Sequence, residues 1–134
     1  QVISSKINSL GYSKAVFGLI HGDLHHGNIL LDRSKNIRLI DFDDAGFGWY
    51  LYDIASLLFE YKDHAEFEML SEGFLRGYRK SRLMSDNDWS MVPLFIHIRG
   101  RATIGWASER PELENTNQIL NLVESVCNEA NSLL

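Results

Sequence analysis

Apolar residues along this chain change their spacing at about residue 50, from short runs to a helical repeat. Before that point, three apolar runs at residues 16–20, 29–32 and 37–40 are typical of short β-strands. Residues 33–36, between the last two runs, are polar and turn-forming. The pattern therefore predicts that the second and third strands pair as a β-hairpin.

Elsewhere the apolar residues recur at helical spacing. The predicted helices span about residues 2–10, 50–61, 67–78, 89–109 and 111–133. Gly11 follows the first helix and suits a left-handed stop, and Pro111 suits the first turn of the last helix. A capping cluster at residues 85–88 precedes the long helix. We predict an α+β fold, a small sheet with a mostly helical remainder, forming a single domain over residues 1–134.

Composition narrows the class of protein. The chain has 134 residues, of which 45% are hydrophobic and 23% charged, as expected for one globular domain with a core. A net charge of −5 disfavours nucleic acid as a partner, and no apolar run is long enough to span a membrane. The single cysteine, Cys127, excludes an internal disulfide and indicates a cytoplasmic location. No charged-then-apolar leader opens the chain. It begins with Gln1 rather than methionine, so we expect it to be a piece of a longer protein.

The candidate chemistry lies between the first strand and the end of the hairpin. Residues 21–28 read HGDLHHGN, and residues 39–43 read LIDFD. Asp23, Asn28 five residues later, and Asp41 after an apolar run are the parts that phosphoryl transfer from Mg·ATP requires. One carboxylate orients the acceptor hydroxyl, and hard oxygen ligands hold the metal ion.

These two motifs, together with residues 51–55 (LYDIA), resemble the aminoglycoside phosphotransferase and choline kinase family. The resemblance is detailed over about residues 17–61. It implies the C-terminal lobe of a bilobal, protein-kinase-like fold, in which the short hairpin carries the catalytic and metal-binding loops. It also implies an enzyme, a kinase that moves the γ-phosphoryl group of ATP to a hydroxyl of a small molecule.

The resemblance also implies roles for individual residues. Asp23 is the expected catalytic carboxylate, and Asn28 and Asp41 are the expected Mg²⁺ ligands. Asp53 is expected to be a buried structural acid that supports the catalytic loop, because a buried carboxylate needs hydrogen-bond donors. His21 is expected to hold the same loop through hydrogen bonds.

Residues after the metal carboxylate are candidates for contact with the acceptor. Asp43 and Asp44 are loop-capping residues, ligands of a second metal ion, or substrate-facing acids, which would favour a cationic acceptor such as an amine. Trp49 is either a core residue or part of an acceptor pocket. Arg99, in the long helix, lies either on a solvated face or against an anionic group of the substrate.

The chain also departs from the family pattern. The family places a β-rich lobe, with a phosphate-covering loop and a lysine for the ATP phosphates, before the catalytic motif. Only twenty residues precede His21 here, and they read as a helix. We therefore expect the N-terminal β lobe to be absent, and the chain to be a fragment or a truncation.

Two alternatives to a kinase stay open. In the first, the chain is a truncated, non-catalytic lobe that binds a partner or self-associates through the surface left by the missing lobe. In the second, it is a Zn²⁺ metallohydrolase built on His21, Asp23, His25 and His26. A loop this short does not easily bring four side chains to one ion, and Asn28 and Asp41 would then have no role.

Overall fold

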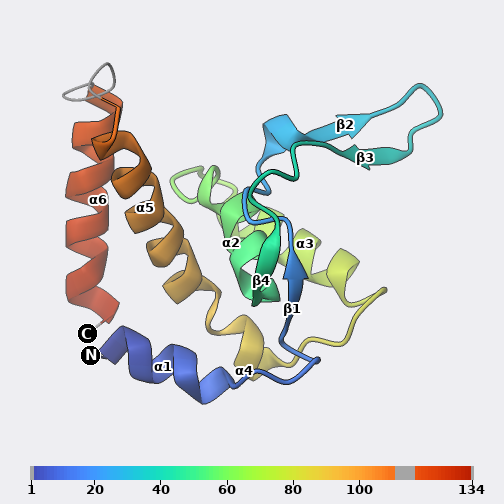
Figure 1. Cartoon of the computed structure of the whole chain (residues 1–134), viewed down its shortest axis with the longest axis horizontal. Coiled ribbons are helices and arrows are strands. Elements are labelled where there is room, and N and C mark those ends of the chain that lie inside the picture. Colours follow the sequence, from blue (N-terminus) through green and yellow to red (C-terminus); the bar gives the residue numbers. More distant parts are fainter. Residues whose placement is uncertain (1, 111–116, 134) are drawn as a thin grey trace.

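Figure 1 shows the computed structural model, which describes residues 2–110 and 117–133. The predicted α+β class is confirmed. Helices make up most of the chain, and two small antiparallel sheets lie in its first half. The elements are α1 (Val2–Leu10), β1 (Phe17–Ile20), the 3-10 turn η1 (His26–Asn28), β2 (Ile29–Leu31), β3 (Ile37–Leu39), β4 (Gly46–Trp49), α2 (Tyr50–Phe59), α3 (Phe67–Tyr78), α4 (Asp86–Trp89), α5 (Val92–Ser108) and α6 (Asn117–Leu133).

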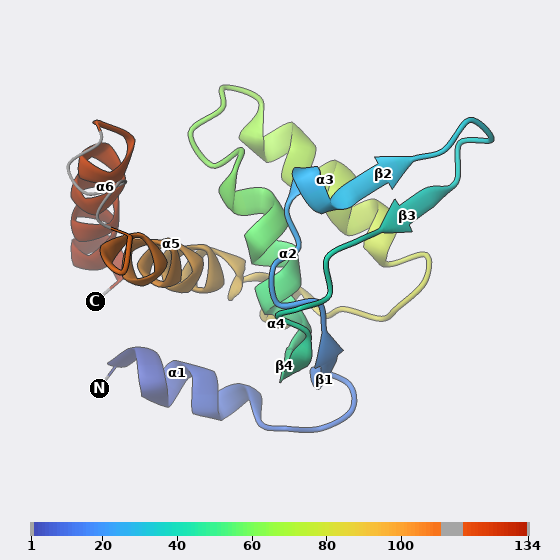
Figure 2. The same ribbon diagram turned by 45° about the horizontal axis from the view of Figure 1, so that its top comes forward.

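The predicted hairpin is present. Strands β2 and β3 pair antiparallel, with Ile29 opposite Leu39, and Figures 1 and 2 show the hairpin projecting away from the helices. Asp32 shapes the turn, because its carboxylate accepts hydrogen bonds from the backbone N–H groups of Ser34 and Asn36, at 2.9 and 2.8 Å. This is the local bonding by which aspartate favours turns.

Strand β4 was not among the predicted strands. It pairs antiparallel with β1, so that Phe17 lies opposite Trp49 and Gly18 opposite Gly48. Glycines at positions 46 and 48 weaken the β-strand pattern in the sequence. A Cβ at position 48 would lie 2.4 Å from Cδ1 of Ile20, so any larger residue there would require the Ile20 side chain to move. The glycines that allow close packing between β1 and β4 are therefore also the reason why the sequence pattern does not predict β4.

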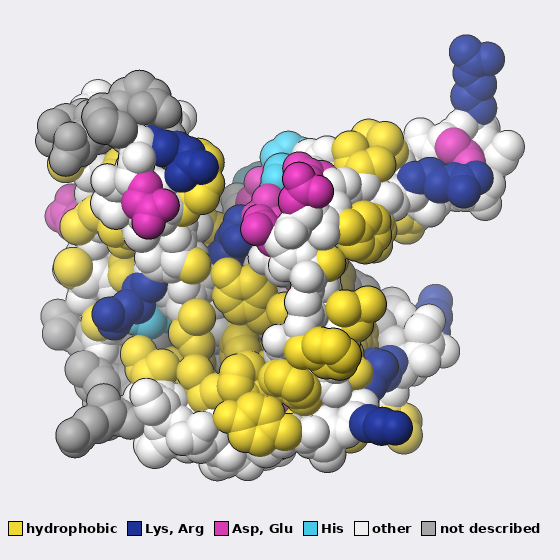
Figure 3. Space-filling view, viewed as in Figure 1, with side chains coloured by type: hydrophobic (Ala, Val, Ile, Leu, Met, Phe, Trp, Pro, Cys, Tyr) yellow, Lys and Arg dark blue, Asp and Glu magenta, His cyan; other side chains and the backbone are white. Residues whose placement is uncertain are grey.

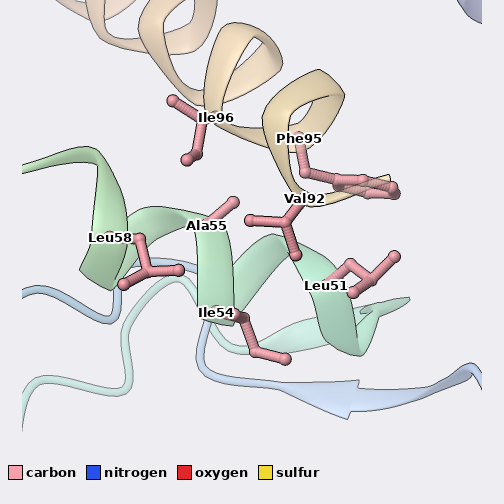
Figure 4. Packing of buried hydrophobic residues seen from close by; sticks show 7 residues of the cluster. All are labelled: Leu51, Ile54, Ala55, Leu58, Val92, Phe95 and Ile96. Carbon is pink, nitrogen blue, oxygen red and sulfur yellow. The ribbon is translucent and has the colours of Figure 1, made fainter. Parts of the chain in front are cut away.

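The core forms where α2 crosses α5, as Figure 4 shows. Both helices direct an apolar face at this contact, which consists of Leu51, Ile54, Ala55, Leu58, Val92, Phe95 and Ile96, all less than 10% exposed. Burying a large apolar side chain contributes about 1.5–3 kcal/mol, so this contact fixes the two helices firmly. Both helices also supply side chains to the candidate site.

Helix α6 packs along the other side of α5. Gly100 permits this close approach, because a Cβ at that position would lie 2.7 Å from Cγ2 of Val126. Lys62, just beyond α2, donates hydrogen bonds to Ser125 and Glu129 of α6 at 2.7 and 2.8 Å. Its side chain is only 11% exposed, so the contact joins the two helices through a partly desolvated ion pair.

One helix boundary differs from the sequence prediction, and another lies outside the described residues. The long helix expected over residues 89–109 is broken: α4 ends at Trp89, and α5 begins at Val92. Pro93 in the first turn of α5 explains the break, because it has no N–H to continue a preceding helix. The predicted start of the last helix at Pro111 falls outside the described residues. No helix among the described residues is long and apolar enough to cross a membrane.

Candidate active site

The loop that carries Asp23 is fixed to the first turn of α2 by Asp53, which is only partly buried and not buried as expected. The backbone N–H of His21 donates to Oδ2 of Asp53 at 2.7 Å, and that of Gly22 donates to Oδ1 at 3.0 Å. Gly22 has a φ of +84°, and a Cβ there would lie 2.3 Å from the carbonyl oxygen of Asp44. The loop therefore needs glycine at this position, both for its conformation and for its close approach to Asp44.

Backbone hydrogen bonds bring the loop to the end of the hairpin. Asn28 is 6% exposed, and its Nδ2 donates to the carbonyl oxygen of Asp23 at 2.9 Å. The N–H of Ile40 donates to the carbonyl of Asn28 at 3.1 Å, and the ring of His21 bonds the carbonyl of Ile40 through Nε2 at 2.9 Å. Asp41 follows Ile40 directly, so its backbone lies beside Asn28.

The donor atoms of Asn28 and Asp41 fit a hard divalent cation. The Nδ2 end of the Asn28 amide is occupied by Asp23, which leaves the oxygen as the end that can bind a metal. Asp41 is exposed and has a φ of +62°, a left-handed conformation that is uncommon for a residue with a Cβ. Such conformations cluster at functional sites. Amide and carboxylate oxygens are ligands that suit Mg²⁺.

A cavity of about 610 Å³ opens beside Asp23. Its lining combines residues of the catalytic loop, the segment before β4, and helices α2 and α5, among them Gly22, Asp23, His25, Asp44, Phe47, Tyr52, Arg99 and Trp106. Of the candidate acceptor contacts, Asp44 lines the cavity and Asp43 does not. Trp106 is 52% exposed. Its helical sequence context had instead favoured a position in the core.

Trp49 lies apart from this cavity, among core aromatic rings. Its ring centroid lies 5.2 Å from that of Phe17 and 6.4 Å from that of Phe95, and its Nε1 donates to the carbonyl of Gly11 at 2.9 Å. These are the contacts of a packing residue whose polar atom is satisfied. Of the two interpretations that the sequence left open for Trp49, the structure thus favours the core position over a substrate-facing one.

Arg99 contacts a group that sequence analysis did not identify as its partner. Its Nη2 lies 2.5 Å from Oδ1 of Asp23, and its side chain is 19% exposed. Burial lowers the pKa of Arg99, but hydrogen bonds with Tyr52 and Asp23 outweigh it, so the pKa is raised above its ordinary value. The sequence offered a solvated face or an anionic substrate group as partners for Arg99. The partner in the fold is the carboxylate of Asp23.

Histidines 25 and 26 face different acidic groups. Nε2 of His25 lies 3.6 Å from Oδ2 of Asp23, whereas Nδ1 of His26 lies 2.7 Å from Oε2 of Glu60. His21 is 4% exposed and directs Nε2 at a backbone carbonyl. The set of four zinc ligands considered for a metallohydrolase is therefore not gathered at one point. Figure 3 shows histidine and acidic side chains close together beside the start of the hairpin.

The catalytic-loop and hairpin residues lie within a segment that matches a known family. The model of the phosphotransferase enzyme family covers residues 11–91, more than half of the chain. The chain belongs to the phosphotransferase enzyme family. The resemblance to aminoglycoside phosphotransferases inferred from the motifs is thus confirmed.

Individual members of the phosphotransferase family are similar to this chain. Amicoumacin kinase of Bacillus subtilis (strain 168) is 36% identical over 107 residues, which is 72% of this chain and 31% of that protein. A solved microcompartment-associated aminopropanol kinase superposes with a TM-score of 0.75 at 27% identity, covering 98% of this chain and 40% of the other. A solved amicoumacin kinase in complex with AMP-PNP, Ca²⁺ and Ami gives a TM-score of 0.75 at 28% identity, with 98% and 41% covered. The chain therefore spans about a third of the curated relative and about two fifths of these structures.

Proposed function

We propose that this chain carries the catalytic and metal-binding residues of an ATP-dependent kinase that phosphorylates a hydroxyl group of a small molecule. One observation carries the proposal. Asp23 lines a cavity of about 610 Å³, and its backbone carbonyl is hydrogen-bonded to the amide of Asn28, the candidate metal ligand. An acceptor site and a metal site thus adjoin at a single residue. The small-molecule kinases among the relatives support the same activity.

In this proposal Asp23 is the catalytic carboxylate. It accepts the proton of the acceptor hydroxyl and aligns the oxygen, which bonds to the γ-phosphorus of ATP as the bond from that phosphorus to the bridging oxygen of ADP breaks. The reaction has a loose transition state, so alignment of the oxygen contributes more than the basicity of the carboxylate. Arg99, bonded to Oδ1, fixes the rotamer of Asp23 and leaves Oδ2 for the acceptor.

Asn28 and Asp41 would hold the metal ion through their side-chain oxygens. A bound Mg²⁺ would supply positive charge against the negative charge that develops during transfer. The solved amicoumacin kinase complex contains AMP-PNP and Ca²⁺, which supports a nucleotide and a divalent cation at this kind of site. We assign Mg²⁺ to this chain because two hard oxygen ligands suit it.

Asp53 and His21 hold the loop that carries Asp23 in position. Asp53 clamps two consecutive N–H groups of the catalytic loop to α2, and His21 joins the loop to the residue before Asp41. Neither side chain is among the residues that line the cavity. We therefore propose positioning roles for both, and a substrate-facing role for Asp44, whose carboxylate suits a cationic group on the acceptor. A cytoplasmic location, where Cys127 stays reduced, fits this proposal.

Ligand-induced stabilisation of the chain tests the metal and nucleotide site. Thermal denaturation is measured with Mg·ATP, with ATP and EDTA, and with neither. Saturation at a hundredfold excess over Kd stabilises by about 2.7 kcal/mol, and we expect this only when Mg²⁺ is present. Asp41→Ala should remove the effect, whereas Asp43→Ala, two residues away and also exposed, should keep it. A stabilisation that survives Asp41→Ala contradicts the assignment.

A self-associating module is the second candidate. Apolar side chains of the hairpin and β4 are widely exposed: Leu31 and Ile37 by 68% each, and Phe47 by 80%. Exposed apolar surface of this kind favours a protein partner or a second copy. Light scattering coupled to size-exclusion chromatography distinguishes the cases, because self-association raises the measured mass with concentration. The pair of substitutions Leu31→Lys and Ile37→Lys should then restore the monomer mass.

A further inference from the structure

His25, His26 and Glu60 form a compact group beside the active site that phosphoryl transfer does not use. The two histidines open the 3-10 turn η1, and Glu60 follows the last residue of α2. One ligand atom from each of the three lies within 4.8 Å of the other two. No other such group of histidine, cysteine, aspartate and glutamate occurs within residues 2–110 and 117–133.

We propose that these three side chains bind a divalent transition-metal ion, Zn²⁺ being the best match, at a site distinct from Asn28 and Asp41. Two imidazoles and one carboxylate are a ligand set that zinc accepts and that Mg²⁺ disfavours. The proposal goes beyond kinase activity and does not depend on it.

A tetrahedral site needs a small rearrangement, in which the His26–Glu60 pair opens slightly and the longer separations shorten. Ligand atoms around a tetrahedral zinc ion with bonds of about 2.1 Å lie about 3.4 Å apart. Nδ1 of His26 and Oε2 of Glu60 already lie 2.7 Å apart, and all three ligand atoms lie within 4.8 Å. The backbone N–H of His26 also donates to Oε2 at 2.8 Å, which fixes the carboxylate at the turn. The histidine side chains are 35% and 69% exposed, so an ion can enter and keep a water ligand.

His25 connects this site to the active site. Its Nδ1 accepts a hydrogen bond from the N–H of Gly27 at 3.1 Å, and its Nε2 lies 3.6 Å from Oδ2 of Asp23. A neutral imidazole has one lone pair, so metal binding removes the bond from Gly27 and changes the contact with Asp23. The lost hydrogen bond costs about 1 kcal/mol, which a metal–imidazole bond offsets. Zinc at this site should therefore disturb the turn that ends at Asn28.

Calorimetric titration of the metal-free chain with ZnCl₂, in the presence of excess Mg²⁺, tests the proposal. We expect one equivalent of zinc to bind. Glu60→Gln and His26→Gln should each weaken binding by about tenfold or more, the range known for disturbed metal sites. Glu60→Gln keeps an acceptor for the N–H of His26, and the His26 side chain is largely exposed, so both variants should fold. Circular dichroism checks that they do.

Two further variants locate the ion. His64→Gln changes an exposed histidine outside the group, and Asp41→Asn changes the proposed Mg²⁺ ligand. Both should bind zinc as tightly as the parent chain. Co²⁺ as a probe should give the strong visible absorption of a tetrahedral ion, lost in Glu60→Gln. Three outcomes overturn the proposal: no saturable zinc binding, undiminished binding in both Glu60→Gln and His26→Gln, or binding lost in Asp41→Asn but kept in Glu60→Gln.

Discussion

Arg99 and Asp23 are 76 positions apart in the sequence, yet Nη2 of Arg99 lies 2.5 Å from Oδ1 of Asp23. The contact joins the middle of α5 to the catalytic loop. It places a permanently charged group on one oxygen of the carboxylate, while the other oxygen faces His25 at 3.6 Å. The core helix α5 thus contributes a side chain directly to the candidate active site.

Removing this partner should destabilise the chain. Arg99→Ala leaves Asp23, whose side chain is 28% exposed, with a single weaker partner. Because the pair is partly solvated, we expect a loss of about 1 kcal/mol in the free energy of unfolding, below the range for fully buried pairs. Arg101→Ala, on an exposed position of the same helix, should change it by less than about 0.5 kcal/mol. Urea denaturation measures both, and equal effects would show that the Arg99 contact adds nothing.

The hydrogen bonds that Asp53 accepts from the loop should contribute more to the free energy of unfolding than the Arg99–Asp23 pair does. Asp53→Ala leaves the N–H groups of His21 and Gly22 without their acceptors, and we expect unfolding to become easier by about 1–3 kcal/mol. The control is Asp63→Ala, since the Asp63 side chain is 82% exposed. Loss of nucleotide binding with unchanged stability would give Asp53 a direct role in ligand binding instead.

Much of this fold could be predicted from residues that are close together in the sequence. The hairpin and the helix ending at Gly11 depend on neighbouring residues, and both were predicted from spacing and turn chemistry. Asp23, Asn28 and Asp41 could be predicted as candidates because one short segment contains them. Strand β4 was missed because Gly46 and Gly48 interrupt its apolar pattern, while Gly48 packs against the Ile20 side chain across the sheet. A contact made only after folding leaves no periodic signal in the sequence.

The same reason explains why the contacts of Arg99 and Glu60 could not be predicted from the sequence. Arg99 lies in α5 and Glu60 directly follows α2, and their sequence context matches that of any polar residue on or beside a helix surface. Only the crossing of α2 and α5, and the position of the loop against α2, bring them to Asp23 and His26. The sequence shows that Arg99 and Glu60 are charged, but it does not show which residues they contact.

Glycine 22 provides a sharp test of the loop conformation. Gly22→Ala should destabilise the chain by about 1–3 kcal/mol, because φ is +84° and the new Cβ would meet the Asp44 carbonyl at 2.3 Å. Gly105→Ala, in α5 with nothing within 4 Å, should instead stabilise it by about 0.5–1 kcal/mol. Thermal denaturation of the two variants should give shifts of opposite sign. A neutral Gly22→Ala would mean that the loop adopts another conformation.

The hairpin turn should lose its order in acid. Hydrogen bonds from Asn36, first from its backbone N–H and then from its side chain, hold the pKa of Asp32 below the ordinary value of 3.8. The folded pKa is lowered, so the stabilisation is present above the unfolded pKa and is lost as pH falls through the folded pKa. NMR titration of the carboxyl carbon should give a midpoint below 3.8, and Asn36→Ala should raise it. A midpoint at or above 3.8 would show that the turn bonds are absent in solution.

The projecting hairpin has a practical consequence for protein engineering. Its base carries Asn28 and Asp41, but its tip at residues 33–36 extends away from the helices, and the tip N–H groups of Ser34 and Asn36 donate to Asp32 at the edge of the turn. Exposed loop tips accept inserted sequences best. A fluorescent protein or affinity peptide grafted between Arg33 and Asn36 would leave the cavity and the α2–α5 core untouched. This tip is thus an attachment point for a reporter that follows the lobe without altering its chemistry.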